Sequence, residues 1–341
     1  MATIKDVAKH AQVSTSTVSH VLNKTRYVSE MITEKVLTAV EALNYSPSAL
    51  ARSLKLKNTR TFGMLVTTSI NPFFAEVVKG VERRCYEQGY NLLLCNTEGD
   101  FERLRFNIDM LLQKRVDGLL LMSDELVNQN IDIFARHTAV PTVVMDSGDT
   151  DFPSDKIQDN SYHGGYIATQ YLINKGHINI GCIRGPLDKP TAKKRYAGFE
   201  QAMLDANLTI HENWIETANF ECEEGAMAFK NMHKRGPLPT ALFVCNDMMA
   251  MGVINAASNL GMSIPEDLSL IGYDDIKIAR YMTPSLTTIH QSKFHLGQQA
   301  FDTLLNKIQT QRETDLEIQL EPTLVERDSV KSLKVEPSLN S

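Results

Sequence analysis

Short runs rich in Val, Ile and Leu recur along the chain from Thr61 onward, and amphipathic segments separate them. The runs are FGMLVTT, NLLLCNT, VDGLLLMS, PTVVMDS, NIGCIRG, ALFVCND and LSLIGYDD. They show little strict alternation of apolar and polar residues, which is typical of strands buried on both faces. Because such strands alternate with helical segments, the pattern predicts an α/β fold, with parallel sheets covered by helices.

The runs fall into two series, and a chain of 341 residues favours two or three domains over one. We therefore expect two doubly wound parallel α/β lobes, with late segments that return first to one lobe and then to the other. The expected ranges are about 61–160 and 291–320 for lobe 1, about 161–290 and 321–330 for lobe 2, and 331–341 for a tail after the core at 61–330.

Residues 1–45 predict an all-α helix-turn-helix head. Apolar residues recur at helical spacing from Ile4 to Ala11, a short turn follows, and Ser14 is a good N-cap for a second helix at about 15–23. A third periodic stretch at 31–43 completes the layout. The outer face of the second helix carries short polar groups that fit the major groove of DNA. The candidate DNA-binding residues of the head are Ser14, Thr15, Ser16, Thr17, Ser19, His20 and Asn23.

Charge is distributed unevenly between this head and the rest of the chain. Residues 1–60 hold nine Lys and Arg against four Asp and Glu, so they carry +5. The whole chain carries −6, so the remainder carries −11. A small basic head on an acidic body favours nucleic acid as the partner of the head and a different ligand for the body.

The string ATIKDVAKHAQVSTSTVSHVLN resembles the DNA-binding head of the LacI/GalR family of bacterial repressors. The string YSPSALARSLK, at 45–55, resembles the hinge helix of the same family, and Pro47 suits its first helical position. The body resembles a periplasmic sugar-binding protein, so the resemblance covers nearly the full length. It implies a repressor that binds a near-palindromic operator as a homodimer.

Residues 46–60 are then expected to form a hinge helix and linker. A helix this short is marginal alone. In the family, two hinges pack together on DNA and each inserts a leucine into the minor groove. The resemblance gives this role to Leu54 and places Arg52 and Lys55 near the phosphates. A plain linker is the alternative.

Polar and aromatic side chains follow the apolar runs, at the end of the strands where α/β sheets bind ligands. A carboxylate accepts hydrogen bonds from two sugar hydroxyls, arginine and amides bind the others, and aromatic rings cover the C–H faces. The candidate ligand-binding residues are Asn71, Phe73, Phe74, Asp146, Arg195, Phe220, Asn246, Asp274 and Gln291.

These positions resemble the ribose-contacting positions of a bacterial ribose-binding protein, and within the family the closest resemblance is to its ribose operon repressors. The resemblance implies a repressor that is released from its operator by D-ribose. The alternative is a purine repressor with hypoxanthine or guanine as corepressor. That type reads the base with an arginine and a threonine after a GPLE-like turn, where this chain has Lys189, Pro190 and Thr191.

Other functional classes have little support in the sequence. The five cysteines show no CxxC spacing and the histidines no HExxH, so we expect reduced thiols, no metal and no cofactor. The adjacent Asp274 and Asp275 suggest hydrolysis, but no nucleophile elbow, P-loop or GxGxxG accompanies them, so no enzyme is expected. The charged start MATIKDVAKHA and the lack of a long apolar run predict a cytoplasmic, nucleoid-associated protein without membrane contact.

Overall fold

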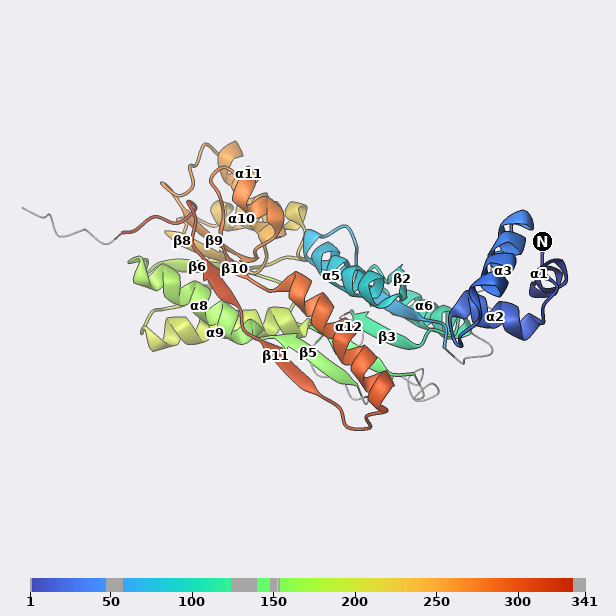
Figure 1. Cartoon of the computed structure of the whole chain (residues 1–341). Helices are drawn as coiled ribbons and strands as arrows, with labels where there is room; N and C mark the ends of the chain where they lie inside the picture. Colours follow the sequence, from blue (N-terminus) through green and yellow to red (C-terminus); the bar gives the residue numbers. More distant parts are fainter. Residues whose placement is uncertain (1, 47–57, 124–139, 148–151, 153, 334–341) are drawn as a thin grey trace, which may run out of the picture. The chain divides into compact units, whose positions relative to one another are not determined.

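The computed structural model describes residues 2–46, 58–123, 140–147, 152 and 154–333. The chain divides into two compact units, Met1–Arg60 and Thr61–Ser341. The first unit is all-α and the second holds two α/β lobes (Figure 1). The predicted fold class is therefore confirmed, although the predicted hinge helix lies outside the described residues. No helix among those residues is long and apolar enough to cross a membrane.

Three helices build the first unit: α1 (Ile4–Ala11), α2 (Thr15–Asn23) and α3 (Glu30–Ala42). Ser14 caps α2, because its hydroxyl accepts a hydrogen bond from the Thr17 backbone N–H at 3.1 Å. Val7, Val18 and Val36, one from each helix, are fully buried in a small common core. This core fixes the face of α2 that points away from the head.

The first sheet of the second unit has the strand order β11-β5-β4-β3-β1-β2, and all its paired strands run parallel. Its strands are β1 (Thr61–Val66), β2 (Asn91–Asn96), β3 (Gly118–Met122), β4 (Thr142–Met145), β5 (Asp155–Asp159) and β11 (Glu317–Leu320). Its helices are α5 (Pro72–Gln88), α6 (Phe101–Gln113) and α12 (Lys293–Thr310). Figure 1 shows α5 and α12 side by side, consistent with the many contacts between them.

Helices cover both faces of this sheet, as a doubly wound arrangement requires. Met64 of β1 lies in one buried cluster with Val77 of α5, whereas the next residue, Leu65, packs with Leu104 of α6. Successive strand residues point to opposite faces. A strand covered on both sides therefore needs apolar residues at most positions, which explains the apolar run of β1, whereas the run NLLLCN of β2 is mostly exposed and not buried on both faces as expected.

The second sheet has the strand order β12-β10-β9-β8-β6-β7. Its strands are β6 (Ile180–Arg184), β7 (Ile215–Thr217), β8 (Ala241–Val244), β9 (Ser269–Asp274), β10 (Thr287–His290) and β12 (Thr323–Val325). Its helices are α8 (Ser161–Asn174), α9 (Pro190–Asp205), α10 (Cys222–Lys234) and α11 (Asp247–Asn259), with short 3₁₀ turns η2 (Glu212–Trp214) and η3 (Lys277–Tyr281). Figure 1 shows α8 and α9 on one side of the sheet and α10 and α11 on the other.

The segment LEIQLEPTLVER near the end of the chain contributes to both sheets. Two strands form there, because β11 joins the first sheet and β12 the second. Thr323, the first residue of β12, pairs with His290, the last residue of β10. The chain thus enters the second sheet at the carboxyl end of β10 and must run antiparallel to it. The second sheet is therefore mixed, whereas a parallel sheet was expected.

The chain passes between the two sheets three times, after β5, after β10 and after β11. Each passage starts at the carboxyl end of a strand. Ligands of parallel α/β sheets bind at those ends, so this region is where a site is expected.

Candidate functional site

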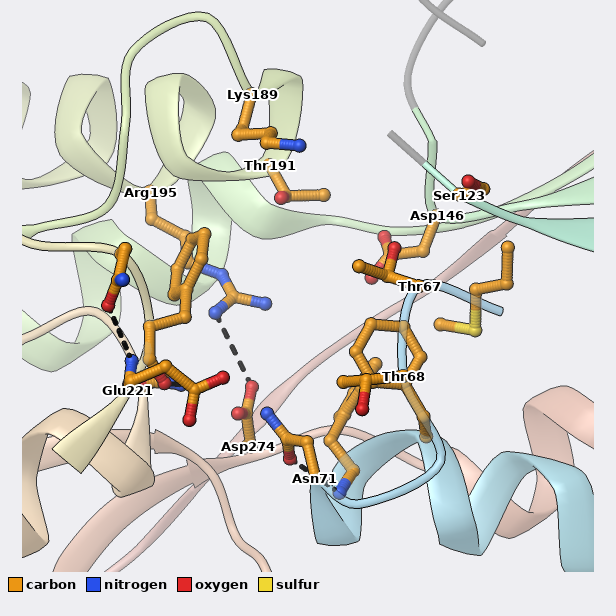
Figure 2. Close-up of a pocket in the computed structure, with 16 residues that line it drawn as sticks. Thr67, Thr68, Asn71, Ser123, Asp146, Lys189, Thr191, Arg195, Glu221 and Asp274 are labelled. Atoms are coloured by element: carbon orange, nitrogen blue, oxygen red, sulfur yellow. Dashed lines mark hydrogen bonds and ion pairs between the residues drawn. The ribbon is translucent and has the colours of Figure 1, made fainter. Parts of the chain in front are cut away.

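A cavity of about 160 Å³ lies within the second unit, at the carboxyl ends of strands from both sheets (Figure 2). This volume is small beside the ~300–1,000 Å³ of pockets for drug-sized ligands, so a small molecule is the appropriate occupant. Eight of the nine residues expected to bind ligand line the cavity. They are Asn71, Phe73, Phe74, Asp146, Arg195, Phe220, Asn246 and Asp274.

Gln291 is the exception, since it lies beneath the cavity and does not line it. It follows β10 and is 2% exposed. Its Nε2 donates to Oδ1 of Asp274 at 2.8 Å. Gln291 therefore holds the Asp274 carboxylate in place. Its position after a strand predicted direct contact with the ligand. A position in the sequence does not reveal which neighbour a side chain reaches, and here that neighbour is Asp274.

Arg195 and Asp274 form the charged base of the cavity, where Figure 2 shows them pointing at each other. Nη1 of Arg195 lies 3.4 Å from Oδ1 of Asp274 and donates to the Cys245 carbonyl at 2.6 Å. The guanidinium carbon lies 3.8 Å from the ring centroid of Tyr273, a cation–π distance. Nε of Arg195 is buried and has no hydrogen-bond partner among the described residues.

Burial affects the protonation of Asp274 at the floor of the cavity. It raises the pKa of Asp274 to about 6, although Arg195 and Lys293 favour the charged form. Burial lowers the pKa of Arg195, but the charges of Asp274 and of nearby carboxylates raise it by more, so the guanidinium stays charged. The cavity therefore offers a fixed cation beside a carboxyl that takes up a proton in mildly acidic solution.

Three residues of the cavity have backbones in the left-handed region. Their φ angles are 49° for Asp146, 74° for Phe220 and 108° for Asp274. A side chain in this region is strained and persists only where the surrounding structure enforces it, which happens mostly at functional sites. Each of these residues is thus turned into the cavity by the chain that follows a strand.

Two of the three asparagines that line the cavity, Asn71 and Asn246, also serve as helix caps. Oδ1 of Asn71 accepts from the Phe73 N–H at 3.0 Å at the start of α5. Oδ1 of Asn246 accepts from the Met249 N–H at 2.9 Å at the start of α11, and its Nδ2 donates to the Phe220 carbonyl at 2.9 Å. These bonds fix the amides, so Asn246 also holds the backbone of Phe220 in place.

Aromatic rings form the apolar walls. The rings of Phe73 and Phe74 meet edge to face, with centroids 5.4 Å apart. Phe220 lines the cavity from the second lobe, next to Gly185, where a Cβ would lie 2.2 Å from the Phe220 ring. A planar or C–H-rich molecule would therefore be covered from both lobes.

The structure adds eight lining residues to the expected set: Thr67, Thr68, Met122, Ser123, Lys189, Thr191, Asn219 and Glu221. Most of them directly follow a strand or flank an expected residue, which is the signal that could have identified them. Lys189 and Thr191 stand at the start of α9, in the turn that separates the ribose and purine alternatives, and Figure 2 shows both beside the cavity.

The head presents α2 as the candidate DNA-binding helix. Ser14, Thr15, Ser16 and Asn23 are exposed, whereas Thr17, Ser19 and His20 are partly buried. Several of these groups bond one another, as Oγ of Ser14 with Oγ1 of Thr17 at 2.8 Å and Nδ2 of Asn23 with the Ser19 carbonyl at 2.9 Å. The remaining candidates, Arg52, Leu54 and Lys55, lie outside the described residues.

Comparison with known proteins agrees with this architecture. Residues 3–48 match the family described as "Bacterial regulatory proteins, lacI family", and residues 169–330 match the "Periplasmic binding protein-like domain". The HTH-type transcriptional repressor PurR of Vibrio campbellii is 50% identical over 333 residues, which are 98% of this chain and 100% of that one.

Two solved structures extend the comparison. The lac repressor dimer bound to operator and the anti-inducer ONPF has a TM-score of 0.87 at 28% identity, covering 97% of this chain and 99% of that one. A LacI family transcriptional regulator from Enterococcus faecium with bound ribose has a TM-score of 0.72 at 29% identity, covering 80% and 100%.

A helix-turn-helix head followed by a periplasmic-binding-protein-like core defines a class of bacterial transcriptional regulators. The chain belongs to the lacI family of these regulatory proteins. The family resemblance of the sequence is thereby confirmed. Because the relatives are transcriptional repressors, the expectation that the chain is not an enzyme is confirmed as well.

The expectation of a ribose-released repressor is wrong. Relatives that are 50% identical over the whole chain are named PurR, whereas the ribose-bound regulator is 29% identical. The ribose interpretation depended on the candidate residues at the strand ends, from Asn71 to Gln291, a set that suits any small polar ligand with flat faces. It also counted the turn with Lys189 and Thr191 against a purine ligand, because the purine type has an arginine and a threonine there.

Proposed function

We propose that the chain is a purine-responsive transcriptional repressor, with hypoxanthine or guanine as its corepressor. The observation that carries the proposal is the 50% identity to PurR proteins over 98% of the chain. In this account the protein binds a near-palindromic operator as a homodimer, in the cytoplasm beside the DNA. The lac repressor, which has the same architecture, is a dimer on its operator.

The chemistry of the cavity supports a purine base. Such a base is a flat heteroaromatic ring, and Phe73, Phe74 and Phe220 offer apolar faces on which it can stack. Its ring N–H groups need an acceptor, which Asp274 supplies. Its carbonyl and ring nitrogens need donors, which Arg195 and Thr191 supply.

The volume and charge of the cavity support the same class of ligand. About 160 Å³ suits a single fused ring system. Three carboxylates, of Asp146, Glu221 and Asp274, line the cavity with two cations, Lys189 and Arg195, so the lining carries a net negative charge. An anionic ligand would meet repulsion there, whereas a neutral base would not.

We assign DNA recognition to residues 1–45, connection to residues 46–60, and ligand binding to the core at 61–330. The exposed hydroxyls of Ser14, Thr15 and Ser16 support contact with base edges or phosphates. Leu54 as minor-groove wedge, flanked by Arg52 and Lys55, is a further part of the proposal.

The sign of the response distinguishes this function from sugar-induced release. A corepressor binds the operator-bound form more tightly than the free form, so it must strengthen operator binding. By thermodynamic linkage, operator must strengthen hypoxanthine binding by the same factor.

The test is fluorescence anisotropy of a labelled near-palindromic duplex, selected by the full-length protein from a random library. Hypoxanthine is expected to lower the Kd of the protein–duplex complex, and D-ribose to leave it unchanged. The Thr191→Val variant keeps the side-chain shape and removes the hydroxyl, so it should weaken the hypoxanthine response. Lys193→Met, on the same helix but exposed and outside the cavity, is the matched control and should respond normally.

Two results would contradict the proposal. One is a weaker duplex complex on addition of D-ribose, which would mean a sugar-released repressor. The other is a duplex Kd that hypoxanthine and guanine do not change.

A further inference from the structure

One buried hydrogen bond joins the two sheets directly below the cavity. Oη of Tyr273, in β9 of the second sheet, donates to Oδ2 of Asp159, the last residue of β5 in the first sheet, at 2.8 Å. Tyr273 is 0% exposed and Asp159 is 7% exposed. A buried tyrosine hydroxyl normally finds a partner, but here the partner belongs to the other lobe.

Asp159 stands where the chain leaves the first sheet. α8 begins at Ser161, only two residues later, and packs against α9 of the second lobe. The hydrogen bond therefore fixes one of the three passages between the lobes. Gly164 of α8 closes the space around the hydroxyl, because a Cβ there would lie 2.1 Å from Oη of Tyr273. The tyrosine ring therefore packs directly against the backbone of α8 at this glycine.

Both partners touch residues that line the cavity. The guanidinium of Arg195 lies 3.8 Å from the centroid of the Tyr273 ring. On the other side, the backbone N–H of Asp159 donates to Oδ1 of Asp146 at 3.4 Å. A continuous path of contacts thus runs from Arg195, in the second lobe, through Tyr273 and Asp159 to Asp146, in the first.

We propose that Tyr273 and Asp159 are positioning residues for ligand binding, which hold Asp146 and Arg195 at the separation that the ligand requires. Neither residue lines the cavity, so each acts through its neighbour and not on the ligand itself. The identity of the ligand in the test rests on the proposed purine function, but the geometric part of the inference does not.

The alternative is that the bond only stabilises the fold. Two features of the chain separate these roles. Asp159→Asn keeps an oxygen that accepts from Tyr273, so it should rescue a positioning role, whereas Asp159→Ala removes the acceptor. A matched pair, Tyr166 and Asp205, forms a similar bond of 3.1 Å between α8 and α9 of the same lobe. Tyr166→Phe therefore removes a Tyr–Asp bond without affecting the contact between the lobes.

The experiment is calorimetric titration of the full-length variants with hypoxanthine. Tyr273→Phe is expected to raise the Kd about tenfold, the effect of losing one hydrogen bond to a carboxyl group. Asp159→Ala should do the same, and combining the two changes should add little, because both remove one interaction. Asp159→Asn and Tyr166→Phe should stay within about twofold of the unchanged protein.

Hydrogen exchange of the ligand-free variants tests the geometric part independently. Tyr273→Phe should speed exchange at the Asp159 amide, which faces Asp146, and Asp159→Asn should not. If the unchanged protein fails to bind hypoxanthine, the proposed function fails while the exchange result still decides the positioning role. The inference is overturned if Tyr273→Phe leaves exchange at Asp159 unchanged, or if it binds hypoxanthine as well as Tyr166→Phe does.

Discussion

The pair below the cavity makes a sharp prediction about stability and pH. Burial, with a further contribution from Asp146, raises the pKa of Asp159 to about 7, against an ordinary value of 3.8. The hydrogen bond from Tyr273 and the charge of Arg195 oppose this shift but are outweighed. Asp159→Asn mimics the protonated carboxyl at every pH, so it removes this titration while keeping a side chain of the same shape.

The direction in which the free energy of unfolding changes with pH follows from the pKa of Asp159 in the folded and unfolded chains. The unfolded carboxyl loses its proton near pH 4, whereas the folded one keeps it until about pH 7. Between these values the folded state binds more protons, so the free energy of unfolding falls as pH rises and levels off above about 7. Each pKa unit corresponds to about 1.4 kcal/mol. From pH ~5.5 to pH ~8 the protein should lose about 2 kcal/mol from this group, and the asparagine variant should not.

Urea unfolding measures this difference, with fluorescence of Trp214 as the probe. Trp214 is the only tryptophan of the chain and lies in η2 of the core, so the head does not contribute to the signal. Other buried carboxyls, such as Asp274, titrate in both proteins and largely cancel in the comparison. Asp205→Asn is the matched control, since Asp205 also accepts from a tyrosine but is exposed.

The reasoning is refuted if the gap between Asp159→Asn and the unchanged protein is the same at pH ~5.5 and pH ~8. It is also refuted if the variant loses stability relative to the unchanged protein as pH rises. The first result would mean that Asp159 is ionised throughout this range, and that Arg195 neutralises it despite its burial.

Three further predictions concern the N-cap of α2, the carboxylate of Asp274 in the cavity and the buried ammonium of Lys293. Ser14→Ala should lower the stability of the head by about 1 kcal/mol, measured by thermal unfolding of the far-ultraviolet signal, because the first turn of α2 loses its cap. Asp274→Ala should abolish hypoxanthine binding in calorimetry while the protein still binds the duplex, since the purine N–H groups would lose the carboxylate that accepts their hydrogen bonds. Lys293→Met should lower the urea stability of the core by about 3 kcal/mol, because three backbone carbonyls lose the ammonium that donates to them. Exposed Lys230→Met is its control and should change little.

Much of the fold follows from local patterns that a sequence displays directly. β1, β3, β4 and β9 are buried at almost every position, so most of their residues are apolar. The same holds for the head, where helical spacing places Val7, Val18 and Val36 in one core. Such elements are predictable because burial on both faces demands apolar side chains throughout.

β5 is a buried strand that no apolar run in the sequence predicts. Its sequence, DKIQD, contains one large apolar residue, yet most of the strand is buried. Its two aspartates are buried because distant groups bind them: Arg312 pairs with Asp155 at 2.6 Å, and Tyr273 donates to Asp159. These partners lie more than a hundred residues away, so no local pattern identifies the strand.

The residues that line the cavity also differ in how far the sequence predicts them. Residues that directly follow strands, such as Asp146 and Asp274, were predictable from strand ends alone. Lys189 and Thr191 reach the cavity through the placement of α9, which depends on tertiary packing. The ligand was assigned wrongly because the residues at the strand ends are those that the sites of several small ligands have in common.

Calorimetric titration of the full-length protein with hypoxanthine and with D-ribose, each alone and in the presence of the selected duplex, is the most direct test of the central claim. Hypoxanthine is expected to bind and the duplex to tighten its binding, while D-ribose gives no heat beyond dilution. Binding of D-ribose that the duplex weakens, together with no binding of hypoxanthine or guanine, would contradict it.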